Sequence, residues 1–444
     1  MAKATIISLG CARNLLDSEI IAGSLKRSGF KICDGEKPVD LCVINTCAFI
    51  NSAREESIDS ILEAVSLKRS GRIKHLVVCG CLPQLYKDKL SRELRDIDLV
   101  LGTADFPRIA DFIKGLKNGF RRTAVSSRPS YLYDEDSPRL RLTPGHYAYV
   151  KISEGCSNFC SYCIISRLRG AFRSRRIESV VAEVNALSKG GALKEINLIG
   201  QDTTAFGIDR YGKTVFPALL KRLCCLKNNV RWVRILYTHP GHYTDELIST
   251  IRGEERICKY LDLPIQHISD KILKRMNRRT TKKGIMELID KLRKKIPGVA
   301  LRTSIITGFP GETEENFKEL LEFLSRTKIE RLGAFMYSKE DGTRAAGFKS
   351  HIPDRIKKER LDELMKLQRN ISGKLNASLL GSAVEVLIDE KVRGEKDRFL
   401  GRRYADAPEV DGVVYVTGKG LKAGDFQKVR IVDTLEYDLV GRAG

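Results

Sequence analysis

Glu-Gly-Cys-Ser-Asn-Phe-Cys-Ser-Tyr-Cys, at residues 154–163, brings three cysteines close together in the sequence. Cys156, Cys160 and Cys163, which we call the loop triplet, follow the spacing C-x3-C-x2-C. A structural zinc site takes four protein ligands, usually as two separated pairs. A 4Fe–4S cluster has four irons, so three thiolates leave one iron free to chelate a small molecule. The spacing therefore favours an open 4Fe–4S cluster over the alternatives, a zinc loop or a set of buried thiols.

A second set of three cysteines, which we call the N-terminal triplet, precedes the first. Cys11, Cys47 and Cys81 are far apart in sequence, yet each falls one to three residues after an apolar run that reads as a β-strand. The carboxyl ends of parallel strands meet at one edge of an α/β sheet, so we expect these thiolates to converge there, again one ligand short. Chance placement is the alternative, and Cys79 is a competing ligand. The remaining cysteines are expected to be small core residues, namely Cys33, Cys42, Cys224, Cys225 and Cys258.

Patterns of short apolar runs and helical periodicity divide the chain into three units of an α/β protein. Residues 1–126 predict a parallel α/β domain with strands at 5–9, 41–45, 76–79 and 99–101. Residues 127–144 contain several Pro-based turns and predict a linker. Residues 145–372 predict a partial (β/α)6 barrel with strands at 147–152, 195–199, 232–237, 260–263, 299–306 and 332–337. Residues 373–444 predict a small all-β barrel with strands at 383–388, 412–417 and 427–432.

The positive charge of the chain is concentrated in its central unit. The 444 residues carry a formal net charge of +22, and residues 141–372 hold +18 of it. Residues 373–444 are neutral, with 12 basic and 12 acidic residues. A basic unit that also carries the loop triplet favours a polyanionic partner, such as RNA, near that loop. A generally basic, solvated surface is the alternative.

Composition also predicts where the protein works. No run of about 18 apolar residues is present, so no membrane contact is expected. The N-terminus shows no signal-peptide pattern. The 12 cysteines are grouped by motif rather than spaced as pairs, which favours reduced thiolates. These features predict a cytoplasmic protein.

The stretch 154–163 resembles the signature of radical S-adenosylmethionine (SAM) enzymes, and the whole chain resembles the radical SAM methylthiotransferases in the order of its three units. The resemblance implies two 4Fe–4S clusters, a radical cluster on the loop triplet and an auxiliary cluster on the N-terminal triplet. The open iron of the radical cluster would bind the amino and carboxylate groups of SAM, with Tyr162 near the adenine. The C-terminal unit would be a TRAM domain.

The same resemblance implies further cofactor contacts at two strand ends and in one strand. Gly200, Gln201 and Asp202 end the second barrel strand, where the superfamily contacts the methionine amino group of SAM. A helix cap is the alternative for this polar pair. Arg302 is expected to reach the substrate or the SAM carboxylate, or else to form a simple ion pair. The Arg-rich segment at 167–176 holds the cofactor or an acidic substrate, or is a solvated face.

The loop after the fifth barrel strand is similar to the stretch that lines the adenosine site in the family. It reads Gly-Phe-Pro-Gly-Glu, from Gly308 to Glu312. A Pro-Gly turn followed by an N-cap at Thr313 is compatible with that role. Gln266 and His267, after the fourth strand, are candidates to face the same pocket.

The family has two main branches. One methylthiolates a modified adenosine beside the tRNA anticodon, and the other acts on the β-carbon of an aspartate in small-subunit ribosomal protein S-twelve. Residues 8–19, 201–204 and 405–415 resemble the ribosomal-protein branch. The neutral C-terminal unit agrees, because a module that grips tRNA is expected to be basic, and Asp406, Glu409 and Asp411 are expected to face the basic ribosomal protein. Thr-His-Pro at 238–240 and the basic central unit favour the tRNA branch, which is the alternative.

The resemblance also implies a reaction and its partners. One SAM methylates sulfur held on the auxiliary cluster, and a second SAM is cleaved to a radical that removes hydrogen from an unactivated carbon. A sulfur donor and an electron-donor protein are therefore expected. The alternative from another class is an RNA-binding or ribosome-assembly factor with structural clusters. Two triplets without a fourth ligand disfavour it, because structural sites are normally closed.

Overall fold

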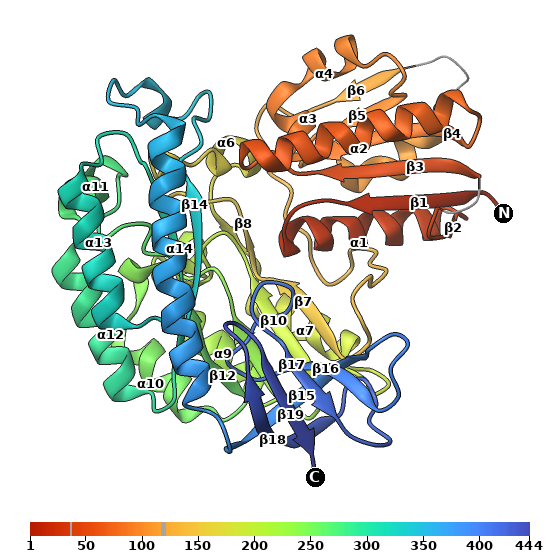
Figure 1. Cartoon of the computed structure of the whole chain (residues 1–444). Coiled ribbons are helices and arrows are strands. Elements are labelled where there is room, and N and C mark those ends of the chain that lie inside the picture. The colour runs from red at the N-terminus through yellow and green to blue at the C-terminus, as the bar shows by residue number, and fades with distance from the viewer. Residues whose placement is uncertain (36–37, 117–120) are drawn as a thin grey trace.

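A computed structural model describes residues 1–35, 38–116 and 121–444 of the chain. Three sheets carry the architecture: a parallel sheet, an open parallel barrel and a small closed barrel (Figure 1). The predicted α/β fold class with a C-terminal β-barrel is confirmed. Within the described residues, no helix combines the length and apolar character needed to cross a bilayer.

Six parallel strands form the N-terminal sheet, in the order β2-β1-β3-β4-β5-β6. Alternate residues of β3 point to opposite faces, so that Leu41 and Val43 join the apolar cluster of α1 while Cys42 and Ile44 join that of α2. Both faces are therefore buried, which is why these strands read as continuous apolar runs. The elements are β1 (Lys3–Ser8), α1 (Ala12–Arg27), β2 (Lys31–Ile32), β3 (Val39–Thr46), α2 (Asn51–Arg69), β4 (Ile73–Gly80), α3 (Cys81–Tyr86), α4 (Asp88–Glu93), β5 (Leu99–Leu101), α5 (Ile109–Lys114) and β6 (Arg122–Ala124).

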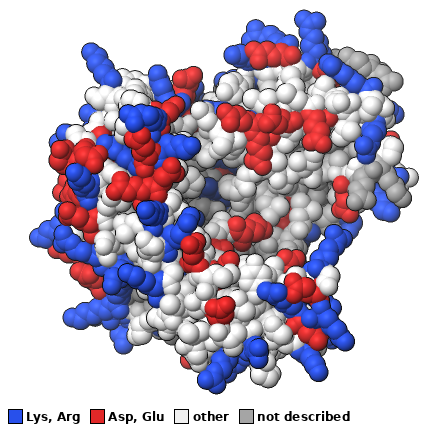
Figure 2. Space-filling view, in the orientation of Figure 1, with Lys and Arg blue, Asp and Glu red and all other residues white. Residues whose placement is uncertain are grey.

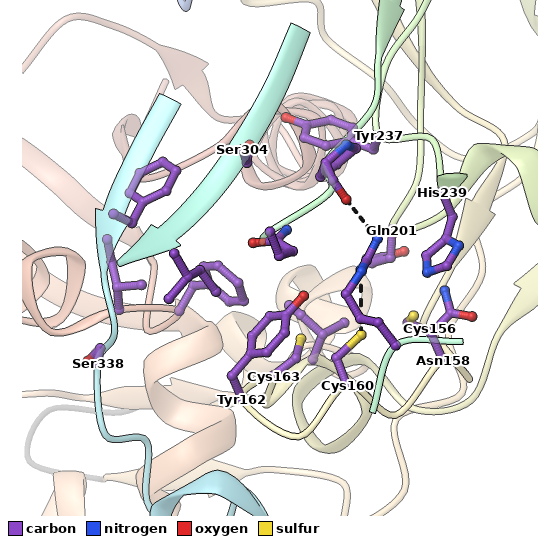
Figure 3. Close-up of a pocket in the computed structure, with 18 of the residues that line it drawn as sticks. Cys156, Asn158, Cys160, Tyr162, Cys163, Gln201, Tyr237, His239, Ser304 and Ser338 are labelled. Carbon is purple, nitrogen blue, oxygen red and sulfur yellow. Dashed lines mark hydrogen bonds between the residues drawn. The ribbon is translucent and has the colours of Figure 1, made fainter. Parts of the chain in front are cut away.

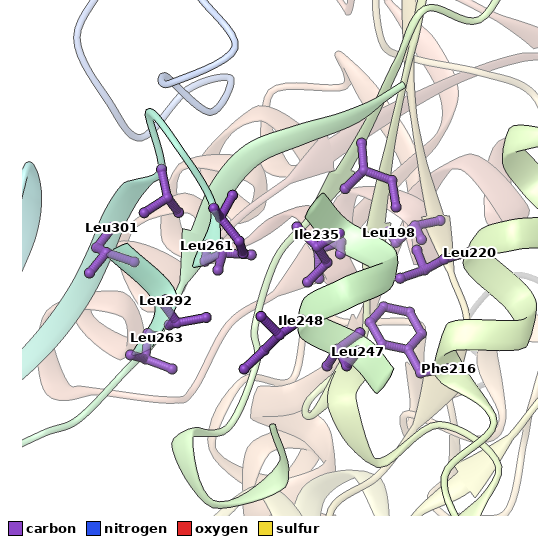
Figure 4. Packing of buried hydrophobic residues seen from close by; sticks show 14 of the residues in the cluster. Leu198, Phe216, Leu220, Ile235, Leu247, Ile248, Leu261, Leu263, Leu292 and Leu301 are labelled. Carbon is purple, nitrogen blue, oxygen red and sulfur yellow. The ribbon is translucent and has the colours of Figure 1, made fainter. Parts of the chain in front are cut away.

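The central unit is an open barrel of six parallel strands, in the order β14-β13-β12-β11-β10-β7. Its strands pack outward against a ring of helices, and Leu198, Ile235 and Leu261 meet Leu220 and Ile248 in this layer (Figure 4). The strands are β7 (Tyr147–Lys151), β10 (Glu195–Ile199), β11 (Trp232–Ile235), β12 (Ile257–Asp262), β13 (Ala300–Thr307) and β14 (Arg331–Met336). The helices are α6 (Ile165–Arg169), α7 (Ile177–Leu187), α8 (Ile208–Tyr211), α9 (Phe216–Cys224), α10 (Asp245–Gly253), α11 (Asp270–Arg275), α12 (Lys282–Lys295), α13 (Glu314–Thr327) and α14 (Asp354–Ala377). A short antiparallel pair, β8 (Ser153–Glu154) and β9 (Arg173–Ser174), frames the loop triplet.

The C-terminal unit is a closed barrel of five strands, in the order β15-β16-β17-β19-β18. The strands are β15 (Ala383–Lys391), β16 (Arg398–Arg402), β17 (Val414–Thr417), β18 (Phe426–Thr434) and β19 (Leu439–Ala443). Three of them coincide with predicted strands. We missed β16 and β19 because each is short and carries arginine and glycine among its apolar residues.

A buried charge network joins the N-terminal unit to the barrel. Asp17 of α1 accepts from Lys151 of β7 at 2.6 Å and from Arg169 of α6 at 2.5 Å. Lys151 also donates to Glu154 at 2.8 Å. All four side chains are less than a tenth exposed. Because buried charges need such partners, the network fixes the two units against each other.

The segment at 127–144 contains no helix or strand, yet it is not loosely attached. Tyr133 is buried and donates to Glu183 of α7 at 3.0 Å. Arg139 forms ion pairs at 2.6 Å with Glu183 and with Glu19 of α1. The segment therefore packs between α1 and α7. The unit boundaries at 126, 144 and 372 stay predictions.

The loop between β16 and β17 closes the amino-terminal end of the open barrel. Asp406 accepts from Arg331 of β14, and Asp411 accepts from Tyr260 of β12 at 2.6 Å. The expectation that Asp406 and Asp411 face a ribosomal protein is wrong, because their side chains are 2% and 4% exposed and neutralise arginines inside the barrel. Glu409 is exposed, and its carboxylate accepts from Tyr147 at 3.0 Å.

Candidate active site

The N-terminal triplet lies at the carboxyl edge of the N-terminal sheet. Cys11 caps α1, Cys47 directly follows β3, and Cys81 begins α3 directly after β4. Gly10 has a φ of +90°, and a Cβ added there would lie 2.7 Å from Cys47 Cβ. Glycine is therefore what lets the Cys11 loop approach Cys47.

Burial and neighbouring charges set the chemistry of these thiols. Burial raises the pKa of Cys47 to about 12, and the nearby Cys81 and Cys11 add to the rise. Burial also raises the pKa of Cys81, against the opposing charge of Arg169, whose Nη2 lies 3.5 Å from the sulfur. Burial acts in the same direction on Cys11, but Arg13 outweighs it and brings the pKa of that thiol to about 7. These three thiols lie close enough to repel one another as anions. They fit an iron–sulfur cluster as a donor set, because bound iron favours the ionised form of each thiol.

The loop triplet lies between β8 and β9, at the carboxyl end of the barrel strands. Gly155 has a φ of +76°, and a Cβ there would lie 2.1 Å from the carbonyl oxygen of Ala171, so the turn into Cys156 requires glycine. Burial raises the pKa of Cys156 to about 11 and that of Cys163 to about 12, and repulsion from neighbouring thiols, including Cys160, contributes. This donor set also fits a cluster with one open iron.

The loop triplet opens into a cavity of about 320 Å³ that both the barrel and the N-terminal unit line. In Figure 3 the three cysteines lie on one side of this cavity and Tyr237 on the other. Phe49, Phe335 and Met336 line it as well, and they are 39%, 44% and 41% exposed. The cavity therefore has an apolar mouth that reaches the surface.

Arg13 connects the two triplets. Its Nε lies 3.4 Å from Cys11 Sγ, and its Nη1 donates to the carbonyl oxygen of Gly200 at 3.4 Å. Its guanidinium carbon stacks 4.3 Å from the centre of the Tyr237 ring. The same cation lowers the pKa values of Cys156 and Cys163 against the effect of burial. The loop triplet lines the cavity and the N-terminal triplet does not, but Arg13, which lines the cavity and contacts Cys11, connects the two sites.

Comparisons with known proteins identify the family. Residues 150–324 match the radical SAM superfamily, residues 3–102 match the family described as "Uncharacterized protein family UPF0004", and residues 380–443 match the TRAM domain. Curated relatives named ribosomal protein uS12 methylthiotransferase RimO match 99% of the chain. The relative from Geobacter sulfurreducens is 46% identical and is covered over 98% of its length, and the one from Desulforamulus reducens is 46% identical and covered over 99%.

The chain belongs to the RimO family of radical SAM methylthiotransferases. It is therefore a transferase, and membership of the superfamily implies a 4Fe–4S cluster and SAM. Solved structures share the fold at low identity. The radical SAM methyltransferase TsrM from Kitasatospora setae has a TM-score of 0.56 at 14% identity, covering 75% of this chain and 73% of its own. The cobalamin-dependent radical SAM enzyme OxsB has a TM-score of 0.53 at 13% identity, covering 83% of this chain and 56% of its own.

In this methylthiotransferase the residues at the end of β10 divide between two roles. Gln201 lines the cavity and donates to Glu154. Asp202 is buried, accepts from Asn158 of the cysteine loop at 2.8 Å and caps the short 3₁₀ turn Thr203–Ala205. The helix-cap alternative therefore describes Asp202, while Gln201 faces the cavity.

Asp202 also belongs to a small group with His239 and His242. The ligand atoms of the three side chains lie within 4.8 Å of one another. His242 Nδ1 is 2.9 Å from the Asp202 carboxylate, and the two imidazoles stack at 4.6 Å. Burial, with help from Arg278, lowers the pKa of His239 to about 3, so this ring is neutral. The group supports Asn158 and through it the cysteine loop.

The loop after β13 points partly away from the cavity. Gly308 donates to the Glu312 carboxylate at 2.9 Å, and Arg360 of α14 donates to the same carboxylate at 2.7 Å. Glu312 is buried in this contact, and neither it nor Gly308 lines the cavity. The predicted N-cap at Thr313 is present, with a capping box to Asn316.

Arg302, Gln266 and Tyr162 do line the cavity, as expected from the sequence. Arg302 is also ion-paired, at 3.2 Å to Asp262 and at 3.4 Å to Asp411. His267 is buried beyond the cavity wall, 3.5 Å from Glu312.

Several residues that shape the site were missed from the sequence. Arg13 and Tyr237 connect the triplets, and Arg278 lies beside Tyr162 with its Nη1 3.8 Å from Cys160 Sγ. The position of Arg13, two residues after Cys11, was the available signal. Arg278 stands in no motif.

Two sequence interpretations of other residues need correction. In the Arg-rich segment, Arg169 and Arg175 are buried and paired with Asp17 and Glu183, whereas Arg167 and Arg176 are exposed, so the solvated-face alternative holds for only part of the segment. Cys225 is exposed, so its expected place in the core is wrong. Cys79 is buried in the sheet and donates to the carbonyl oxygen of Ile44 at 3.6 Å, directed at the neighbouring strand.

Proposed function

We propose that the chain transfers a methylthio group to the β-carbon of an aspartate in ribosomal protein uS12, using two 4Fe–4S clusters and SAM. The proposal rests on two three-cysteine sites, each one ligand short of closure, which Arg13 connects at the wall of one cavity. A purely structural cluster has no need of an open position or of an adjoining cavity. The relatives of nearly equal length that bear the name of this activity support the choice of substrate.

In this proposal the loop triplet holds the radical cluster and the N-terminal triplet holds the auxiliary cluster. When bound, the groups supply the electron that cleaves SAM and the sulfur that is transferred. The protein positions the reactants, because an open-shell reaction needs its partners in contact and shielded from water. Tyr162, Gln201 and Arg302 line the space that SAM would fill.

Arg278 is a candidate partner for the SAM carboxylate. It is buried beside Cys160 and Tyr162, and it donates to the carbonyl oxygen of Pro264 at 2.7 Å. Its Nε has no partner among the described residues. A guanidinium with a free donor, next to the cysteines, suits an anionic carboxylate.

The mouth of the cavity supports a basic protein substrate. Helix α2 begins immediately after Phe49 and Ile50, which line the cavity. Its exposed face carries an acidic row, visible in the upper part of Figure 2. The row consists of Glu55, Glu56, Asp59 and Glu63. Ribosomal proteins are rich in basic residues, so this face and the apolar mouth complement such a partner.

The basic central unit supports a second contact, to RNA. Its surplus of +18 lies on the barrel, whereas the TRAM barrel is neutral. Figure 2 shows many of the barrel's Lys and Arg side chains on its outer helices, interspersed with acidic ones. Ribosomal RNA beside uS12 fits this charge, and so does tRNA, which keeps a tRNA methylthiotransferase as the second candidate function. A sulfur donor and an electron-donor protein complete the partners, and a ribosomal substrate implies a cytoplasmic enzyme.

The test is an anaerobic assay of two cysteine variants. We expect Cys160→Ala to abolish 5′-deoxyadenosine formation, and Cys47→Ala to keep it while losing methylthiolation of uS12. Cys225→Ala, at an exposed cysteine outside both triplets, serves as the matched control and is expected to match the wild type. Methylthiolation by Cys47→Ala would contradict the sulfur-transfer role. Mass spectrometry of uS12 and of tRNA nucleosides from cells lacking the chain distinguishes the two substrates.

A further inference from the structure

Arg13 occupies the space between the two triplets without an acidic partner. Its contacts are Cys11 Sγ, the carbonyl oxygen of Gly200 and the face of Tyr237, all between 3.4 and 4.3 Å. Among the residues that the structure describes, no carboxylate forms an ion pair with Arg13. Its Nη2 makes no hydrogen bond to any of them. The guanidinium lines the cavity, so these free donors are accessible to a ligand.

The other arginines near the two triplets differ from Arg13 in their contacts. Arg169, beside Cys81, is paired with Asp17. Arg302 is paired with both Asp262 and Asp411. Arg278 has no carboxylate partner in the described part of the chain, but its Nη2 donates to Pro264 and the group lies on the Tyr162 side of the loop triplet. Two guanidiniums therefore have donors that are free to bind an anion: Arg278 beside the loop triplet and Arg13 between the triplets.

The proposed reaction brings two carboxylates into this cavity. One belongs to the methionine part of SAM, and the other is the side-chain carboxylate of the target aspartate. The β-carbon that is modified is bonded directly to that second carboxylate group. A group that fixes the carboxylate therefore also fixes the reacting carbon to within one bond length.

We infer that Arg13 binds the side-chain carboxylate of the target aspartate and holds its β-carbon between the two triplets. The inference rests on the proposed function. Cys11 and the Tyr237 ring hold the guanidinium in place, and its remaining donors face the cavity. A planar guanidinium suits a carboxylate because two parallel hydrogen bonds fix both position and orientation. Arg13 is thus a positioning and specificity residue for an acidic target.

The test compares binding of uS12 with its target aspartate and of uS12 with that aspartate changed to asparagine. We expect the reconstituted wild-type enzyme to bind the aspartate form about 10- to 50-fold more tightly, because asparagine loses the charge-assisted bonds. Arg13→Met is expected to bind the two forms within about 2-fold of each other, and Arg13→Lys to keep part of the preference. In turnover, Arg13→Met should raise the KM for uS12.

A matched control variant and a measurement of the clusters distinguish substrate binding by Arg13 from a structural role at the cysteines. Arg27→Met lies on the exposed far end of the same helix and is expected to keep the full preference. Removing a cation 3.4 Å from Cys11 Sγ is expected to shift the electron paramagnetic resonance spectrum of Arg13→Met, but its iron and sulfide content should equal those of the wild type. Loss of cluster iron in that variant, or an unchanged preference for aspartate, would overturn the inference. If Arg13→Met does not fold, Arg13→Gln repeats the comparison with the same two criteria. A wild-type enzyme that leaves uS12 unmodified contradicts the proposed function itself, before any variant is compared.

Discussion

At the residue scale, each cysteine site depends on the backbone immediately before it. Gly10 and Gly155 stand one position ahead of Cys11 and Cys156, and both adopt a positive φ. Their neighbours leave no room for a side chain, since an added Cβ would contact Cys47 in one case and Ala171 in the other. The ligand positions are thus set by residues that bind nothing themselves.

This dependence gives a prediction for Gly10→Ala. The added methyl group would lie 2.7 Å from Cys47 Cβ and 2.9 Å from its sulfur, so the N-terminal triplet cannot close around a cluster. We expect the variant to hold about half of the wild-type iron, since one of two four-iron sites is lost. It should still form 5′-deoxyadenosine and should not methylthiolate uS12. Iron analysis and product assays after anaerobic reconstitution measure this.

Gly29→Ala is the matched control for that prediction. Gly29 ends the same helical segment with a φ of +89°, yet an added Cβ would meet nothing within 4 Å. Both variants carry the same backbone strain, about 1–2 kcal/mol, so only crowding at the cysteines distinguishes them. Equal iron contents in the two variants would show that crowding at Cys47 is unimportant.

The residues of the site differ in how far the sequence could predict them. The six cysteines follow from spacing and from their places after strands. Tyr237 does not, because it lines the cavity through an unusual positive φ that no residue pattern signals. Arg278 stands in no motif, and Glu312 lies in a motif but turns toward Arg360. Orientation of this kind depends on tertiary neighbours.

At the scale of elements, helix α1 connects both halves of the site. Cys11 is the N-cap residue of this helix, and Arg13 lies in its first turn. Asp17 follows one turn later, and its carboxylate binds Lys151 and Arg169 of the barrel unit. Arg169 in turn donates to the Cys81 sulfur. The first two turns of the helix thus both position the N-terminal triplet and attach it to the barrel.

We therefore predict that Asp17→Asn loosens the two units from each other. Removing one partner of a buried ion pair costs about 3 kcal/mol or more, because Lys151 and Arg169 are then left to share the single carboxylate of Glu154. Hydrogen exchange should rise in α1 and β7, and methylthiolation of uS12 should fall at least 10-fold while 5′-deoxyadenosine formation continues. Asp88→Asn, at the exposed start of α4, should leave both measurements unchanged. Unchanged exchange in α1 would mean that other contacts dock the N-terminal unit.

Elements were predictable from the sequence to the extent that they bury a continuous apolar face. Parallel strands such as β3 and β4 are buried on both sides and appear as apolar runs. The strands β16 and β19 do not, since arginine and glycine interrupt their apolar residues. The segment at 127–144 reads as a linker by composition, yet Arg139 ties it to two helices through carboxylates more than 40 residues away.

At the scale of the whole molecule, the open barrel is covered at both ends. The N-terminal unit faces the carboxyl ends of its strands, where the cavity lies. The TRAM barrel lies at the other end, where Asp406 and Asp411 meet Arg331 and Arg302. Arg302 also lines the cavity, so one side chain links the TRAM barrel to the site. The sequence could not predict this closure, because each acid pairs with an arginine at least 75 residues away.

The docking of the TRAM barrel on the open barrel can be followed by tryptophan fluorescence. Trp232 is the single tryptophan of the chain, is 6% exposed at the start of β11 and packs edge-to-face on Phe426 of β18 at 4.9 Å. Burial opposes ionisation of Asp406, but Arg331 and Arg403 hold its pKa below the usual value. Its contribution to docking is therefore complete above about pH 4, the usual aspartate pKa, and is lost as the pH falls through the lower value in the folded protein.

We predict that Asp406→Asn detaches the TRAM barrel from the open barrel at neutral pH. The change leaves two buried arginines unpaired, a cost of about 3 kcal/mol. Trp232 emission should shift to the red, and the Trp232 ring should become accessible to acrylamide at a lower urea concentration than in the wild type. This difference between the variant and the wild type should shrink below about pH 4. Asp433→Asn, at an exposed position of β18, is the matched control. If Trp232 is equally protected in all three proteins, the ion pairs of Asp406 do not hold the TRAM barrel in place, and apolar contacts such as Trp232–Phe426 carry the docking instead.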